Sequence, residues 1–446
     1  MGGDRGVLDF MRVVPEEHNR TTKIRPKFYA RRMKDLMIRG GVFYAIWDES
    51  ASLWSTDFYR AVEIIDTEIL KEYDNYISKY GNDKSVYPAL LSDYSSKMLD
   101  EWNRFCKAIG DTYIPLDEKI IFANESTTQE DYVTKRLPYS LEDGNHEAWD
   151  ELVHTLYSED EAEKIEWLIG CIATGDSKEL QKFFVFYGSG GTGKSTILHV
   201  IEDLFDGFWI AFEAKTLASS SDAFALAPFA SYPLIGINHD GELDKIENNT
   251  RINSLVSHER MVVNEKNKKQ YGAEFHTILL MGTNKPVRIT DAKSGLIRRV
   301  IDIMPSGNLL SRSRYDYICK QVRFELGAIC KHCIDVYRKD KNKYNNYIPE
   351  RMIASTNYMY DFVSEYFNEL SVPEGISLNY AYQLYSTYKD NALLSYPLNK
   401  LNFKEELKNY YKNFTPRSGD GRYNVFSDFI FDKFKSKIAE EYIEPS

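Results

Sequence analysis

Between positions 183 and 204 the hydrophobic residues change from a continuous run to a helical spacing, with a glycine-rich gap between the two. Phe183–Tyr187 is a short apolar run of β-forming residues, which is typical of a buried parallel strand. After the gap, apolar residues recur at helical intervals, at Ile197, Leu198, Val200, Ile201 and Leu204. The pattern predicts a strand, a loop and an amphipathic helix in direct succession.

Further patterns divide the rest of the chain. Strand and helix signals alternate over residues 181–310, which predicts an α/β core. Helices are expected at Tyr59–Tyr80, at Trp149–Leu156, around Ile165–Ile169, at Asn379–Lys389 and at Phe403–Tyr411. Apolar runs beside the turn Arg417–Arg422 suit a β-hairpin, and the polar segment Lys339–Arg351 is typical of a linker.

Composition limits the class of protein. The chain has 446 residues, of which 43% are hydrophobic and 28% charged, as is usual for globular proteins of several domains. No apolar run is long enough to span a membrane and no signal peptide is evident, so we expect a cytoplasmic protein with no membrane partner. Five cysteines suggest reduced thiols. Cys330 and Cys333 form a CxxC pair, but they are expected on the apolar side of a helix and not in a zinc site.

The net charge of −11 does not exclude a nucleic-acid partner, because one local basic feature can bind DNA on an acidic protein. Basic residues gather in two places, Arg20–Gly41 and Asn264–Gln270. Either run could equally be a solvated charged face.

The gap between the predicted strand and helix carries the clearest motif. Gly188, Gly193, Lys194 and Ser195 match GxxxxGK[ST], in which backbone N–H groups and a lysine bind phosphates and a hydroxyl binds Mg²⁺. The predicted nucleotide-binding residues are Gly188, Ser189, Gly190, Gly191, Thr192, Gly193, Lys194, Ser195 and Thr196. Lys194 is expected to neutralise the β- and γ-phosphate oxygens of ATP.

Three later segments carry polar groups suited to nucleotide hydrolysis, two at the end of a strand and one directly before a strand. Tyr232–Asp244 holds an apolar strand ending in Asp240 and Glu242, which are candidates for binding Mg²⁺ and activating water. The strand in Thr277–Pro286 ends in Asn284, an amide suited to orient water or contact the γ-phosphate. Arg298 and Arg299 precede a further strand, where an arginine could reach a nucleotide held by the next subunit.

Taken in order, these features resemble the superfamily 3 helicases of small DNA viruses, most closely the phage and poxvirus-type primase-helicases. The resemblance covers about residues 120–310 well. It implies an AAA+-like P-loop NTPase core that forms a hexameric ring, hydrolyses Mg-ATP between subunits and translocates on single-stranded DNA in the 3′ to 5′ direction. It also implies that Arg299, or failing that Arg298, is an arginine finger acting in trans.

The resemblance assigns roles to further segments. A hairpin at Met261–Phe275 would carry Lys266, Lys268 and Lys269 into the ring channel to bind DNA. The expected layout is an N-terminal region of unassigned role (1–115), a helical collar (116–180), the ATPase core (181–310), a helical segment with linker (311–372) and a winged-helix-like domain (373–446).

Two departures from the family pattern leave alternatives open. Family members usually have two adjacent acids at the acidic strand end, but this chain reads His239-Asp240-Gly241-Glu242. Either Glu242 is the second acid, or His239 occupies the first position and Asp240 serves both roles. Residues 1–110 also lack a primase signature, so a primase or polymerase could act in cis within a longer protein or in trans. Forked DNA is an expected substrate, and phage or mobile-element replication an expected setting.

Two other classes of protein remain as alternatives. The first is an ATP-gated, DNA-binding initiator or loader without processive unwinding. The second, a small-molecule or polynucleotide kinase, is disfavoured because no acceptor-binding lid is visible and the lysine hairpin would have no role.

Overall fold

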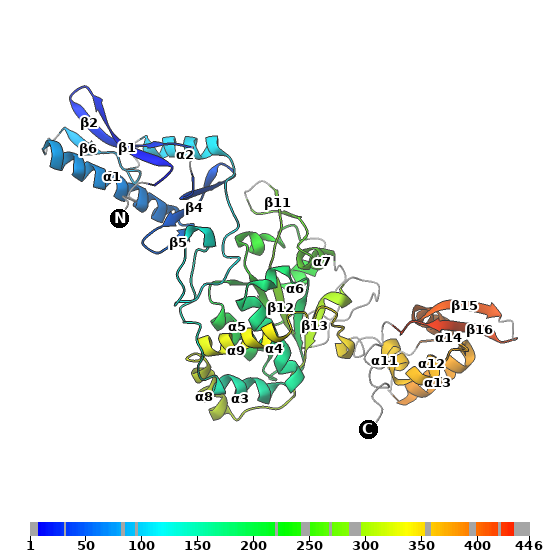
Figure 1. The fold of residues 1–446 in the computed structure, drawn as a ribbon. Coiled ribbons are helices and arrows are strands. Elements are labelled where there is room, and N and C mark those ends of the chain that lie inside the picture. The colour runs from blue at the N-terminus through cyan, green and yellow to red at the C-terminus, as the bar shows by residue number, and fades with distance from the viewer. Residues whose placement is uncertain are drawn as a thin grey trace.

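The computed structural model is a mixed α/β protein (Figure 1). It describes residues 8–30, 33–81, 85–93, 97–218, 222–241, 250–266, 270–284, 296–352, 358–391, 398–417 and 421–431. Within this part of the chain, no helix is both long enough and apolar enough to cross a membrane.

A five-stranded parallel sheet forms the middle of the molecule, in the order β13-β7-β12-β9-β8. Its strands are β7 (Phe183–Tyr187), β8 (Trp209–Ala211), β9 (Ile235–Asn238), β12 (Ile278–Thr283) and β13 (Val300–Ile303). All five residues of β7 and all six of β12 are buried, because helices cover both faces of the sheet. The predicted strand at Phe183–Tyr187 is therefore confirmed.

Alternate residues of β7 point into two separate cores. Phe184 and Phe186 pack with one set of helices, α3 (Glu147–Leu156), α4 (Glu159–Ala173), α5 (Lys194–Leu204), α8 (Arg312–Val322) and α9 (Leu326–Lys339). Phe183 and Val185 face the other side, with α6 (Ala214–Ala218) and α7 (Thr250–Val256). This is the alternation expected of a strand covered on both faces, and it confirms the α/β prediction for this region.

Helices α4 and α9 cross at very close range. A methyl group added at Gly170 of α4 would lie 2.1 Å from the backbone oxygen of Cys333 on α9. Cys330 and Cys333 are fully buried at this crossing and all five cysteines are free, as predicted. Only a residue without a side chain allows this contact, so the crossing depends on Gly170.

The polar segment after α9 differs from the prediction of a linker. Trp167 of α4 donates its indole N–H to the backbone oxygen of Asp340 at 2.9 Å, and Tyr344 is buried against the Trp167 ring. Lys164 Nζ donates to the Tyr347 hydroxyl at 2.9 Å. The tyrosines, which the polar composition obscured, therefore anchor residues 340–347 to α4.

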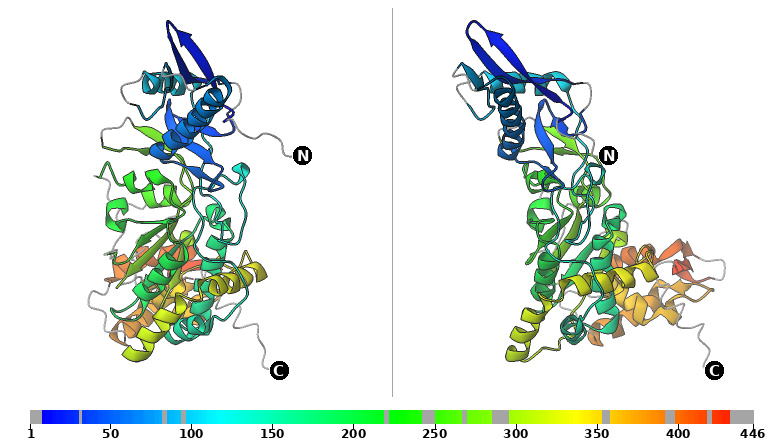
Figure 2. Two further views of the ribbon diagram at one scale, coloured as in Figure 1. Left: turned by 90° about the vertical axis from the view of Figure 1, so that its left-hand side faces the viewer. Right: turned by 60° about the vertical axis from the view of Figure 1, so that its left-hand side comes forward.

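The N-terminal part holds two three-stranded sheets and two helices (Figures 1 and 2). One sheet is formed by β1 (Met11–His18), β2 (Thr21–Phe28) and β6 (Val86–Pro88), the other by β3 (Leu36–Arg39), β4 (Val42–Asp48) and β5 (Leu53–Ser55). The helices are α1 (Phe58–Tyr80), which was predicted almost to the residue, and α2 (Met98–Ile109). The strands were not predicted.

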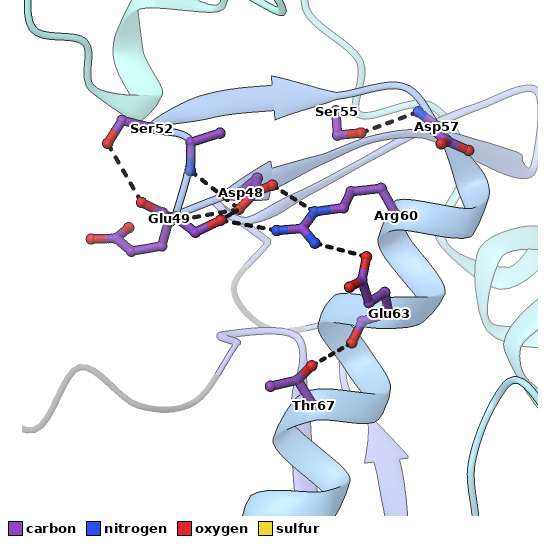
Figure 3. A network of polar contacts seen from close by, with 10 residues as sticks. Asp48, Glu49, Ser52, Ser55, Asp57, Arg60, Glu63 and Thr67 are labelled. Carbon is purple, nitrogen blue, oxygen red and sulfur yellow. Dashed lines mark hydrogen bonds and ion pairs between the residues drawn. The ribbon is translucent and has the colours of Figure 1, made fainter.

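An ion-pair network joins β4 to α1 (Figure 3). Arg60 Nε donates to Asp48 at 2.7 Å, and Arg60 Nη1 donates to Glu63 at 2.7 Å. Burial alone would raise the pKa of Asp48, but the hydrogen bonds from Arg60 and Ser50 outweigh it and lower the pKa to about 2. The network therefore stabilises the N-terminal part through a carboxylate that stays ionised.

Arg39, at the end of β3, connects the N-terminal part to the middle of the molecule. Its guanidinium carbon lies 4.6 Å from the ring centroid of Tyr113 and 4.9 Å from that of Tyr232, whose hydroxyl it also contacts as a hydrogen-bond donor. The rings of Tyr44 and Tyr271 lie 5.7 Å away. We call these five residues the Arg39 cluster; cation–π attraction holds it together.

The C-terminal part has a core of its own. It comprises α11 (Tyr358–Glu365), α12 (Phe367–Leu370), β14 (Ile376–Ser377), α13 (Leu378–Asn391), α14 (Lys400–Leu407), β15 (Tyr411–Arg417) and β16 (Tyr423–Phe429). Helices followed by an antiparallel hairpin agree with the prediction, except that Tyr411 begins β15 and does not end a helix. Whether this part acts as a winged helix stays a prediction.

Candidate functional site

The glycine-rich loop lies between β7 and α5, as the sequence predicts. Gly191 and Gly193 have φ values of 77° and 96°, which residues with a side chain rarely adopt. A methyl group at Gly190 or Gly191 would meet no atom within 4 Å, so the loop backbone borders open space. Helix α5 begins at Lys194, slightly before the predicted start.

Lys194 folds back over the loop. Its Nζ donates to the backbone oxygens of Gly188 and Ser189 at 2.7 and 2.9 Å, and to Asn284 Oδ1 at 3.2 Å. The residue is only 6% exposed. Burial lowers the pKa of Lys194, and the nearby charge of Asp240 opposes that shift. The ammonium group is thus held by weak neutral acceptors that a stronger anionic partner could replace.

Two further strands bring their polar ends to the same edge of the sheet. Asp240 lies just after β9, and Asn284 directly follows β12. Because β12 lies between β7 and β9 in a parallel sheet, the ends of all three strands meet at one edge. Asn284 Nδ2 donates to Asp240 Oδ1 at 3.3 Å, which completes a connected set of Lys194, Asn284 and Asp240.

These residues line a cleft of about 530 Å³. Loop residues 190–196 line it together with His239, Asp240 and Asn284, and a second wall, which adjoins the loop, contains Leu156, Leu309, Leu310, Arg312 and Tyr315. The Tyr315 hydroxyl lies 2.8 Å from Thr196 Oγ1. The sequence analysis did not identify the second wall, because no motif marks α8 as a neighbour of the loop.

Of the residues predicted to bind Mg²⁺ or to activate water, Ser195 and Asp240 are described and Glu242 is not. Asp240 and Ser195 are exposed at the cleft. Glu242 lies outside the described residues, so the choice between Asp240 and Glu242 as the second acid stays as the sequence left it.

Arg298 and Arg299 are distant from the loop of their own chain. They end a short 3₁₀ turn, η4 (Ile297–Arg299), directly before β13, and Val300 pairs with Phe183 at the start of β7. The arginines therefore lie at the edge of the sheet opposite the loop. Arg298 is exposed, whereas Arg299 donates to Ser257 Oγ, just after α7, and, at 3.5 Å, to Asn253 Oδ1 on α7.

The predicted lysine hairpin is present as β10 (Met261–Val263) and β11 (Tyr271–Ala273), which pair antiparallel. Lys266 is exposed in the connecting segment. Lys268 and Lys269 lie outside the described residues, so their predicted DNA-binding role remains a prediction.

Comparison with known proteins provides limited further information. Residues 186–299, a range that includes the whole loop, Asp240, the hairpin and both arginines, match a family of unknown function (DUF5906). No curated protein matches the chain.

Among solved structures, the chain is similar to the C-terminal region of NrS-1. One apo structure is 14% identical, with 71% of this chain and 84% of that chain covered and a TM-score of 0.44. A second, in the A form, is also 14% identical, with 80% and 90% covered and a TM-score of 0.45. With likeness this low, the functional assignment depends on this chain's own residues.

Proposed function

We propose that this chain is an ATP hydrolase that uses Mg-ATP to drive a DNA helicase in replication. The observation that carries the proposal is the connected set of Lys194, Asn284 and Asp240 in one cleft beside a glycine-rich loop. An amide and a carboxylate at the ends of adjacent parallel strands, with a cation at the start of α5, are groups that phosphoryl transfer to water requires.

The residues present fit ATP and Mg²⁺. The loop backbone around Gly190 and Gly191 borders open space in which phosphates would lie, at the N-terminus of α5. The cleft volume of about 530 Å³ is in the range of nucleotide-sized ligand sites. Ser195 and Asp240, both exposed at the cleft, would hold Mg²⁺. The second wall, with its leucines and Tyr315, would contact the rest of the nucleotide.

Each polar group then has a distinct task. Lys194 would exchange its backbone acceptors for β- and γ-phosphate oxygens, which are stronger acceptors because they are charged. Asn284 would sense the γ-phosphate or orient water while it holds Lys194 in place. Asp240 or Glu242 would polarise the attacking water.

We further propose that the protein acts as a hexameric ring on single-stranded DNA, moving 3′ to 5′. The position of Arg298 and Arg299 at the sheet edge opposite the loop supports a role in trans, because neither can reach its own chain's loop. The exposed Arg298 is available to a neighbouring subunit as it stands, whereas Arg299 would first have to leave Ser257. Lys266 on the hairpin would contact DNA in the channel.

The decisive experiment compares Asp240→Asn and Glu242→Gln for ATP binding, ATP turnover and unwinding of forked DNA. If Asp240 holds the metal, Asp240→Asn weakens Mg-ATP binding and stops turnover. Glu242→Gln stops turnover without loss of binding if Glu242 polarises water, and full activity in that variant returns this role to Asp240.

Two outcomes would redirect the proposal. DNA-stimulated ATP turnover without unwinding would favour an ATP-gated initiator or loader. Wild-type turnover in Asp240→Asn would refute the proposed catalytic site.

A further inference from the structure

Three side chains with metal-binding groups converge directly beside the cleft. His199 and Glu202 lie one turn apart on α5, and His239 follows β9. One ligand atom from each of them lies within 4.8 Å of the other two. His239 Nε2 is 2.7 Å from Glu202 Oε1, and His199 Nε2 is 4.0 Å from Glu202 Oε2. None of the three belongs to the glycine-loop motif.

We propose that His199, Glu202 and His239 form a binding site for a divalent transition-metal ion, with Zn²⁺ as the expected ion. Two imidazoles and one carboxylate are a ligand set of zinc proteins, in which water completes a tetrahedron. Ligand atoms in such a tetrahedron lie roughly 3.3 Å apart, as follows from zinc–ligand bonds of about 2.0–2.1 Å. The observed separations, 2.7 Å from His239 Nε2 to one Glu202 oxygen and 4.0 Å from His199 Nε2 to the other, lie on either side of that value. Nitrogen ligands also disfavour Mg²⁺, which separates this site from the proposed Mg-ATP site.

The protein makes little other use of these groups. Glu202, whose side chain is 13% exposed, has only histidines as partners in the described part of the chain. His239 Nδ1 is buried and has no hydrogen-bond partner there. The side chain of His199 is 64% exposed, so an ion could enter from solvent.

A second cluster of similar type, Asp150, Glu166 and His332, serves as a comparison. There, Glu166 accepts a hydrogen bond from Trp149 Nε1 at 3.1 Å and contacts His332 Nε2 at 3.2 Å. Its carboxylate is already satisfied by protein donors, as is usual for a buried polar network. The contrast favours the cluster beside the cleft as the metal site.

The site has a consequence for the cleft. His239 precedes Asp240 and lines the cleft itself. An ion shared by His239 and α5 would fix the end of β9 against that helix, and would thereby restrict Asp240. Occupation by Zn²⁺ should therefore reduce ATP turnover, an effect that rests on the proposed function, whereas metal binding itself does not.

Metal binding is tested on the full chain after treatment with a chelator. Co²⁺ is titrated while its visible absorption is followed, and Zn²⁺ is then added in competition with a chromophoric chelator. We expect His199→Ala and Glu202→Gln to lower the affinity by about 100-fold or more, since even outer-shell changes cost about 10- to 100-fold. His154→Ala, which removes an exposed histidine elsewhere, and His332→Ala, in the second cluster, should bind as wild type does.

The possible results test metal binding and its effect on ATP turnover separately. Absence of binding by the wild type, or unchanged affinity in both His199→Ala and Glu202→Gln, overturns the proposal. If Zn²⁺ slows ATP turnover in the wild type but not in His199→Ala, the link to the cleft is supported. Binding without any effect on turnover refutes that link and leaves the site. If the protein has no ATP turnover at all, the proposed function fails while the metal titration still decides the site.

Discussion

Replacing Asn284 by alanine tests the connected set in the cleft most directly. The side chain is exposed and follows a fully buried strand, so its removal should leave the core intact. It accepts from Lys194 at 3.2 Å and donates to Asp240 at 3.3 Å, and therefore holds both charged groups at once. Asn284→Ala should misplace Lys194 and Asp240 without unfolding the protein.

The size of the effect follows from these two bonds. A hydrogen bond to a charged group contributes about 1.5–3 kcal/mol, and the lengths here favour the lower end. A loss of about 1.5–3 kcal/mol of transition-state stabilisation reduces kcat by about 10- to 150-fold. The KM for ATP should change less, because the loop backbone and the charge of Lys194 remain.

Steady-state ATP hydrolysis in the presence of Mg²⁺ measures both constants. Asn345→Ala is the matched control, since Asn345 is an exposed asparagine whose side-chain amide, among the described residues, donates to Asn342 Oδ1 alone. Circular dichroism verifies that both variants are folded. A kcat within about twofold of wild type in Asn284→Ala would show that the connected set has no role in turnover.

Three further outcomes are expected. Lys194→Ala should lower ATP turnover by about 100-fold or more without loss of folding, since one lost transition-state contact costs about that much; near wild-type hydrolysis would contradict the phosphate-binding role. Changing Lys266 and Lys268 together to alanine should abolish DNA-stimulated ATPase and unwinding but spare basal ATPase, and normal unwinding would move DNA contact elsewhere. Gly170→Ala should lower the urea midpoint, because overpacking costs about 1–3 kcal/mol, at the upper end here since the 2.1 Å contact is with the Cys333 backbone, and alanine's better helix propensity returns only about 1 kcal/mol; an unchanged midpoint would show that the crossing does not require glycine at this position.

Most of the polar residues in the cleft could be predicted, because each is marked by a local sequence motif or by the end of an apolar strand. The glycine loop has a motif, and Asp240 and Asn284 both follow apolar strands whose ends must meet in a parallel sheet. Tyr315 and Leu310, on the second wall, could not be predicted, because they reach the cleft only through the packing of the chain after β13.

The N-terminal strands were missed for a different reason. Lys23, Arg25 and Lys27 alternate with the buried Ile24 and Pro26, which is a period-two signal. The charge of this run fits a nucleic-acid-binding feature or a solvated face as well as a strand, and proline within a run argues against a strand. Arg25 forms ion pairs with Glu16 and Glu101, so its charge is compensated within the fold. These tertiary ion pairs allow the basic run to form a strand.

The Arg39 cluster means that the lysine hairpin does not extend from the core alone. Tyr271 begins β11 next to the segment that connects the two strands of the hairpin, and Tyr113 follows α2, so one guanidinium contacts both. Any movement of the hairpin therefore either moves the N-terminal part with it or breaks those contacts. Each cation–π contact contributes about 0.5–2 kcal/mol. If the hairpin moves on DNA as proposed, a fluorophore on the exposed face of α1 would report its position, and Arg39→Ala would supply the reference in which that signal is decoupled from the hairpin.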